Sequence, residues 1–74
     1  MNARGERMQI KSNIPEIMKK KKMTILRLAM EAGIATETIA RARDERIGKC
    51  RLETLLLIAR VLDVPVKSLF EQAD

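Results

Sequence analysis

The sequence predicts an all-α fold of five short helices in one small domain. Its length of 74 residues is near the lower limit at which a single hydrophobic core is sufficient. Apolar residues recur at three- and four-residue spacing along most of the chain, and no stretch reads as a ladder of strands or as a repeat. Glycine and proline separate these periodic stretches, as expected for helices joined by short turns.

The N-terminal segment, residues 1–12, is predicted to be a flexible basic arm. It is polar, lacks a helical period and carries Arg4, Arg7 and Lys11, and its Met-Gln-Ile stretch is a candidate short strand. The folded domain is therefore predicted over residues 13–74.

The first helix is predicted to start after a cap at Ser12 or Asn13. Pro15 suits a first helical turn, because proline lacks the amide hydrogen that would be unbonded there. The helix ends in four lysines, residues 19–22, which suit the negative end of the helix dipole. These lysines are either a solvated helix end or a clamp for phosphate.

The second helix has clear signals at both ends. Thr24 is a suitable N-cap, and Gly33 can take the positive φ that ends a helix. Ile25, Leu28 and Ala32 mark its buried stripe, together with Ala29, whose small side chain allows a neighbouring helix to cross closely.

The third helix is predicted to start at Ala35 or Thr36 and to run to about Asp44. The segment that follows, with Gly48 as its turn, separates it from a strongly apolar fourth helix over residues 52–62. The predicted buried face of the fourth helix consists of Leu52, Leu55, Leu56, Ile58, Ala59 and Leu62.

A fifth short helix is predicted after Val64-Pro65. Pro65 disfavours helix in the residue before it and can open a new helix itself. Val66, Leu69 and Phe70 supply its apolar residues, and Phe70 is expected to be buried.

The charge balance indicates an anionic partner. The chain has 15 Lys and Arg against 10 Asp and Glu, a net charge of +5 and a pI near 9.9. No apolar run approaches the roughly 20 residues of a membrane span, and the N-terminus lacks the apolar segment of a signal peptide. One cysteine cannot form an internal disulfide, which fits a reducing cytoplasm.

The residue types argue against an enzyme. The chain has no histidine, no glycine-rich phosphate loop and no carboxylates at metal-ligand spacing, so neither a cofactor nor a metal is predicted. Cys50 lies between Lys49 and Arg51, which can lower the pKa of a thiol, but no histidine is present to pair with it. A small, partly buried Cys50 is the favoured interpretation.

Two short helices joined at Gly33, followed by a basic loop, are typical of a helix-turn-helix. The stretch LAMEAGIATETIARARD, followed by RLETLLLIARVLDVPVKSLF, resembles the Cro and lambda-repressor-like (XRE-type) family of transcriptional regulators. The resemblance covers about residues 14–71 and implies a five-helix DNA-binding domain with the helix-turn-helix in its second and third helices. It also implies a double-stranded DNA partner and, most often, a repressor.

The resemblance implies that Thr36, Glu37 and Arg41 contact bases. Helical geometry agrees, because at about 100° per residue these three share an outward face with Ala40 and Asp44, away from Ile39 and Ala42. Each has an alternative. Arg41 either bonds guanine or contacts a phosphate, Glu37 either accepts from cytosine or only favours its helix dipole, and Thr36 either contacts a base or helps to cap the helix.

Phosphate contacts are predicted mainly from the loop cations. Met18 and Arg43 replace a charge pair common in the family, which leaves Arg43 at the core edge and able to reach a phosphate. Asp44 and Glu45 replace a usual Asn-Gly and are expected to repel the DNA backbone. The predicted phosphate contacts are Thr24, Thr38, Arg43, Arg46, Lys49 and Arg51.

An apolar pair on the fourth helix, Leu57 and Val61, is predicted to be exposed and to form a protein interface, favouring a homodimer. Such a dimer would read half-sites about one helical turn, or roughly 34 Å, apart. The alternative is a protein-interaction module on the same fold, such as an antitoxin, in which the apolar pair binds a partner protein. A membrane-surface or RNA-binding bundle is disfavoured, because Phe70 is the only aromatic residue.

Overall fold

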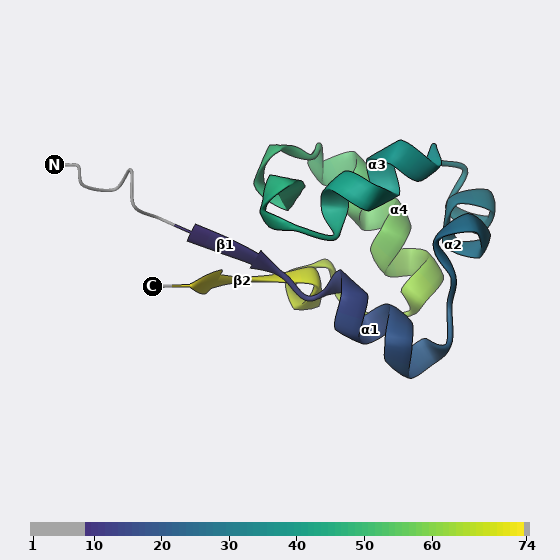
Figure 1. Ribbon diagram of the computed structural model, residues 1–74, viewed down its shortest axis with the longest axis horizontal. Helices are drawn as coiled ribbons and strands as arrows, with labels where there is room; N and C mark the ends of the chain where they lie inside the picture. The colour runs from purple at the N-terminus through teal and green to yellow at the C-terminus, as the bar shows by residue number, and fades with distance from the viewer. Residues whose placement is uncertain (1–8, 74) are drawn as a thin grey trace, which may run out of the picture.

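The computed structural model describes residues 9–73, which form four α-helices, two short 3-10 helices and a two-stranded sheet (Figure 1). The elements in order are β1 (Gln9–Ser12), α1 (Ile14–Lys21), α2 (Ile25–Ala32), α3 (Thr36–Ala42), η2 (Glu45–Lys49), α4 (Leu52–Leu62), η3 (Val66–Leu69) and β2 (Phe70–Ala73). The predicted helices one to four are confirmed. The predictions of a fifth α-helix and of a purely α fold are wrong.

The two strands pair the two ends of the described chain. β1 and β2 are antiparallel, with Ser12 opposite Phe70 and Gln9 opposite Ala73, and they run side by side away from the helices (Figure 1). Residues 9–12, the last four of the predicted arm, thus form a strand, and residues 1–8 lie outside the described residues. Only Val66–Leu69 of the predicted fifth helix is helical, because Phe70 is extended and belongs to the ladder.

The two-stranded ribbon of β1 and β2 needs contacts with the helical part of the domain, because an isolated two-stranded sheet is only marginally stable in water. The side chain of Ile10 lies against η2 so closely that a Cβ on Gly48 would stand 2.9 Å from its Cδ1. Gly48 is therefore inside η2, where it allows this approach, and does not form the predicted turn. The backbone N–H of Asn13 donates to the carbonyl of Leu69 at 2.8 Å, which joins the start of α1 to the end of η3.

Ser12, not Asn13, supplies the side chain at the start of α1. Its Oγ accepts a hydrogen bond from the backbone N–H of Ile14 at 3.3 Å and donates one to the carbonyl of Ala42 at 2.6 Å. Asn13 occupies the N-cap position without a side-chain cap, and its amide donates to the carbonyl of Ser68 instead. The buried Ser12 hydroxyl therefore ties β1 to the end of α3.

The helix-turn-helix has the ends that its sequence predicts. The Oγ1 of Thr24 accepts from the backbone N–H of Arg27 at 3.1 Å, which caps α2. Gly33 ends α2 with a φ of +70°, in the left-handed region that favours glycine. α3 is shorter than predicted, because Ala42 is its last residue and Asp44 is extended.

The core lies between α4 and the first three helices, and the buried stripe of α4 is narrower than predicted. Leu55, Ile58, Ala59 and Leu62 are buried as expected. Leu52 and Leu56, however, are 62% and 51% exposed. The prediction that these two leucines are buried is therefore wrong.

Phe70 is likewise 37% exposed and not buried as expected. It lies at the start of β2 and lines a shallow apolar hollow with Ile10, Leu52 and Leu55.

Candidate nucleic-acid interface

The outward face of α3 is the one predicted to meet DNA. Thr36, Glu37 and Arg41 are all exposed, as is Ala40 between them. On the other side of the helix Ile39 and Ala42 are fully buried, which fixes the rotation of α3 about its axis. The predicted outward set is thus correct for α3 itself, and only Asp44 falls outside the helix.

The structure brings most of the predicted phosphate contacts into one place beside this face. A shallow hollow of about 530 Å³, here called the cationic hollow, collects basic side chains from α3, η2 and the start of α4. Its lining residues are Thr38, Arg41, Arg46, Lys49, Cys50, Arg51 and Thr54. Four positive charges and two hydroxyl donors on one surface can bind the phosphates of a nucleic-acid backbone.

One of these cations is already paired. The guanidinium of Arg46 donates to both carboxylate oxygens of Asp44, with Nε at 3.1 Å from each and Nη2 at 2.9 Å from Oδ2. These hydrogen bonds hold the pKa of the Asp44 carboxyl below its ordinary value and raise the pKa of Arg46. Asp44 therefore neutralises Arg46 within the cationic hollow, a more specific effect than the expected general repulsion of DNA.

This pairing had a local signal in the sequence that the prediction did not use. Asp44 also accepts from the backbone N–H of Arg46 at 2.8 Å and so caps η2. A carboxylate that bonds the backbone two residues further on is a common turn chemistry of Asp. The prediction also left Thr54 out of the phosphate-binding set, because it assigned no role to the first turn of α4.

Cys50 lines the cationic hollow without being activated by it. Desolvation raises the pKa of its thiol and outweighs the opposing effect of Arg41 and Arg46. The pKa of this thiol is therefore raised overall, and Lys49 and Arg51, the neighbours expected to lower it, are not among the causes of the shift. The interpretation of Cys50 as a partly buried residue is confirmed.

Two further predicted contacts lie apart from the cationic hollow. Thr24 and Arg43 line a second depression of about 550 Å³ together with Met18, so the two positions that replace the family's charge pair are indeed neighbours. The Nε of Arg43 is buried and has no hydrogen-bond partner among the described residues. The Thr24 hydroxyl uses its oxygen as a cap acceptor and keeps its hydrogen as a donor.

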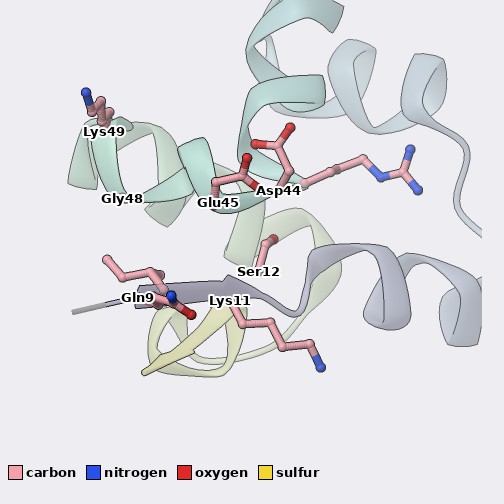
Figure 2. Close-up of a pocket in the computed structure, with 9 residues that line it drawn as sticks. Gln9, Lys11, Ser12, Asp44, Glu45, Gly48 and Lys49 are labelled. Carbon is pink, nitrogen blue, oxygen red and sulfur yellow. The ribbon is translucent and has the colours of Figure 1, made fainter. Parts of the chain in front are cut away.

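A third and larger groove, of about 830 Å³, separates β1 from the segment after α3 (Figure 2). Asp44 and Glu45 stand above β1 in this view, and Lys49 points away from the strand (Figure 2). The groove is lined by these two acids and by three cations, Lys11, Arg43 and Lys49, so its charges largely cancel. It is a weaker place for a polyanion than the cationic hollow.

The apolar pair on α4 is only partly as predicted. Leu57 is exposed, but Val61 is half-buried and packs against the core. The predicted exposure of Val61 is wrong, and an interface at Leu57 must extend over its other exposed neighbours.

The arrangement of α2, the turn at Gly33 and the exposed α3 is that of a helix-turn-helix, and the family comparison agrees. A family model described as the Cro/C1-type HTH DNA-binding domain matches residues 13–72. The chain belongs to this family. No curated protein matches the chain. The Cro/C1-type domain is thus a DNA-binding domain with α2 and α3 as its helix-turn-helix.

Within residues 9–73 no helix is long and apolar enough to cross a membrane. In the same range no group of three or more His, Cys, Asp or Glu side chains is placed to hold a metal ion.

Proposed function

We propose that this Cro/C1-type domain is a cytoplasmic, sequence-specific regulator of transcription that reads the major groove of double-stranded DNA with α3. The observation that carries the proposal is the cationic hollow directly beside the exposed face of α3. A helix that presents base-reading side chains next to a phosphate-binding surface has the two parts that sequence-specific binding needs.

Within this proposal, Arg41 reads a base and the loop cations position the helix. A guanidinium can bond O6 and N7 of guanine together, which is worth about 1–3 kcal/mol of discrimination. Arg41 lies on the exposed face of α3 and also lines the cationic hollow, so Lys49 and Arg51 can hold neighbouring phosphates while it reaches a base edge. Thr36 and Glu37 complete the proposed base-reading set, and Thr24, Thr38, Arg43 and Arg46 the proposed phosphate contacts.

We further propose that the regulator acts as a repressor and as a homodimer. Occupying its site is sufficient to exclude other proteins from that DNA, so repression requires no further surface. The dimer would use the apolar side of α4 that includes Leu57, with Val61 at its edge, and would read two half-sites related by a two-fold axis.

The test is selection from a random duplex library, followed by binding of the enriched sequence against salt. An enriched motif with a steep loss of affinity as salt rises is the expected result. Arg41→Ala should then relax the preference at one base position by about tenfold or more, while Lys49→Ala should weaken all sequences alike. If no motif is enriched, the reading of bases by α3 is refuted.

A second candidate function is a protein-interaction module, favoured by a specific observation on α2. Leu26 and Met30, four residues apart, are 62% and 73% exposed on the solvent side of that helix. If the selection enriches no motif, co-purification of one defined partner, lost in Met30→Lys, would support this function, and a chain that purifies alone would refute it.

A further inference from the structure

We propose that α4 pairs with α4 of a second copy of the chain, antiparallel and about a two-fold axis that passes between Leu56 and Leu57. This inference deepens the proposed homodimer and is independent of which DNA sequence is bound. Its basis is the arrangement of charged and apolar side chains on a face of α4 that is exposed among the described residues 9–73.

The exposed face of α4 lies opposite the core. Leu55, Ile58, Ala59 and Leu62 are buried, and the residues that point away from them are Glu53, Leu56, Leu57 and Arg60, all exposed. Single exposed leucines are ordinary on a soluble protein. Two on one short helix, Leu56 and Leu57, on either side of a central pair of charges, form a surface that a partner of matching shape would bury.

The charges on this face are unpaired within the described chain. Glu53 and Arg60 are seven positions apart, about 10.5 Å along the helix, which is too far for an ion pair between them. The ion pairs found in residues 9–73 involve other side chains. Glu53 and Arg60 are thus available to a partner molecule.

The spacing selects the orientation of that partner. Leu56 and Leu57 stand at the midpoint between Glu53 and Arg60. At about 100° per residue, Glu53 and Arg60 lie within about 20° of each other, and the two leucines flank them on either side. An antiparallel two-fold pairing therefore places Glu53 opposite the partner's Arg60 and repeats this contact at the other end.

The same symmetry matches the apolar side chains. Leu56 meets Leu56 of the partner subunit on one side of the central charges, and Leu57 meets Leu57 of the partner subunit on the other. A parallel pairing would instead bring Glu53 against Glu53 and Arg60 against Arg60, which is repulsive. A second copy of this chain, antiparallel at α4, is the occupant that satisfies both charges and leucines.

The exposed apolar pair on α2 does not offer a comparable surface. Leu26 and Met30 flank no free charge, because Arg27 and Glu31 beside them already pair with each other at 2.7 Å. Nothing on that face would fix the register of a partner. Leu26, an exposed helical leucine at 62% against 51% for Leu56, is therefore the control for a substitution on α4.

The extent of α4 predicts a weak dimer. Two helices of this length bury on the order of 1,000 Å² or less, at the low end of specific interfaces. We expect a dissociation constant in the micromolar range, which sedimentation equilibrium measures without DNA.

The decisive experiment exchanges the two charges. Glu53→Arg gives Arg opposite the partner's Arg60, and Arg60→Glu gives Glu opposite the partner's Glu53, so each variant alone should dimerise at least about tenfold more weakly. An equimolar mixture of the two restores both opposite-charge contacts in a heterodimer. The double variant restores them in a homodimer, and both should return to within about threefold of the original constant.

Controls keep the outcomes clear. Each single exchange places a charge of the wrong sign at one end of α4 and should destabilise the helix. The double variant carries both unfavourable changes, so a recovered dimer cannot result from a more stable fold. Circular dichroism checks that every variant is helical. Leu56→Lys should abolish the dimer, whereas Leu26→Lys should leave it unchanged.

The proposal is overturned if the chain is monomeric up to about 500 µM, if the mixture fails to recover, or if Leu26→Lys disrupts as strongly as Leu56→Lys. None of these outcomes bears on base reading by Arg41, because a monomer can still bind one half-site. Conversely, failure to select a DNA motif would leave the dimer measurement intact.

Discussion

Neutralising Asp44 should strengthen DNA binding and steepen its salt dependence. Asp44 holds Arg46 through three hydrogen-bond distances of 2.9–3.1 Å, so this pair presents almost no net charge to a phosphate. In Asp44→Asn the amide oxygen can still accept from the backbone N–H of Arg46, which preserves the cap of η2. Only the negative charge is removed, and the guanidinium is released into the cationic hollow.

The expected size follows from one additional phosphate contact. Each contact adds about 0.9 to the slope of log affinity against log salt. Between 50 and 200 mM salt the variant should therefore lose roughly 3.5-fold more affinity than the original chain. A unit charge about 4 Å from a phosphate in water is worth about 1 kcal/mol, so at low salt the variant should bind about fivefold tighter.

Fluorescence anisotropy with a labelled duplex measures both quantities. Asp63→Asn is the control, because it makes the same charge change at an exposed residue after α4, where a left-handed φ of +60° also suits Asn. An equal gain in both variants would mean that only net charge matters. An unchanged slope in Asp44→Asn would refute the placement of Arg46 beside the DNA backbone.

Three further predictions concern the scaffold. Gly33→Ala should lower the free energy of unfolding, measured in urea, by about 1–2 kcal/mol, because alanine is strained at positive φ even though nothing lies within 4 Å of the added Cβ. Gly48→Ala should lower it by less, since the flexible end of the Ile10 side chain can move away from the new Cβ. Ser12→Ala should cost about 1–3 kcal/mol in the same assay, because the carbonyl of Ala42 loses its donor. At pH 8, iodoacetamide should alkylate Cys50 severalfold more slowly in the folded chain than in urea, because a raised pKa leaves less thiolate; equal rates would contradict its burial.

The parts of the fold that the sequence predicted are those with local causes. Thr24 caps α2 through a residue three positions away, and Gly33 ends it through its own φ, so neighbouring residues were sufficient to place both. The outward face of α3 followed from helical spacing together with the buried Ile39. Each of these features depends on a short stretch of chain, and each was correct.

The Met-Gln-Ile stretch was a candidate strand, but its pairing with β2 was missed because the cause of that pairing is not local. Strands of four residues carry a weak pattern, and the partner of Ser12 in the ladder, Phe70, lies 58 positions away. Because Phe70 takes part in this pairing, it is extended and does not belong to the predicted fifth helix. The width of the buried stripe on α4 also depends on what packs beside it, so Leu52 and Leu56 were assigned to the core for lack of that information.

The candidate interface was predicted residue by residue but not as a surface. The loop cations were correctly grouped, yet the prediction did not use the local signal for Asp44 pairing with Arg46, and the sequence did not show that Arg43 would lie in a depression with Thr24. Charge counting treats acids and bases as independent. The geometry of η2 decides which of them a phosphate would meet.

The non-local ribbon also bears on base reading. α3 has only seven residues, too few to be stable as an isolated helix, so its position depends on what holds its two ends. The turn at Gly33 fixes the first end, and the buried hydroxyl of Ser12 bonds the carbonyl of Ala42 at the second. Since Arg41 directly precedes Ala42, the strand whose pairing the sequence did not predict holds the residue next to the proposed base reader. Discrimination between bases should thus depend on the pairing of the chain ends as well as on α3.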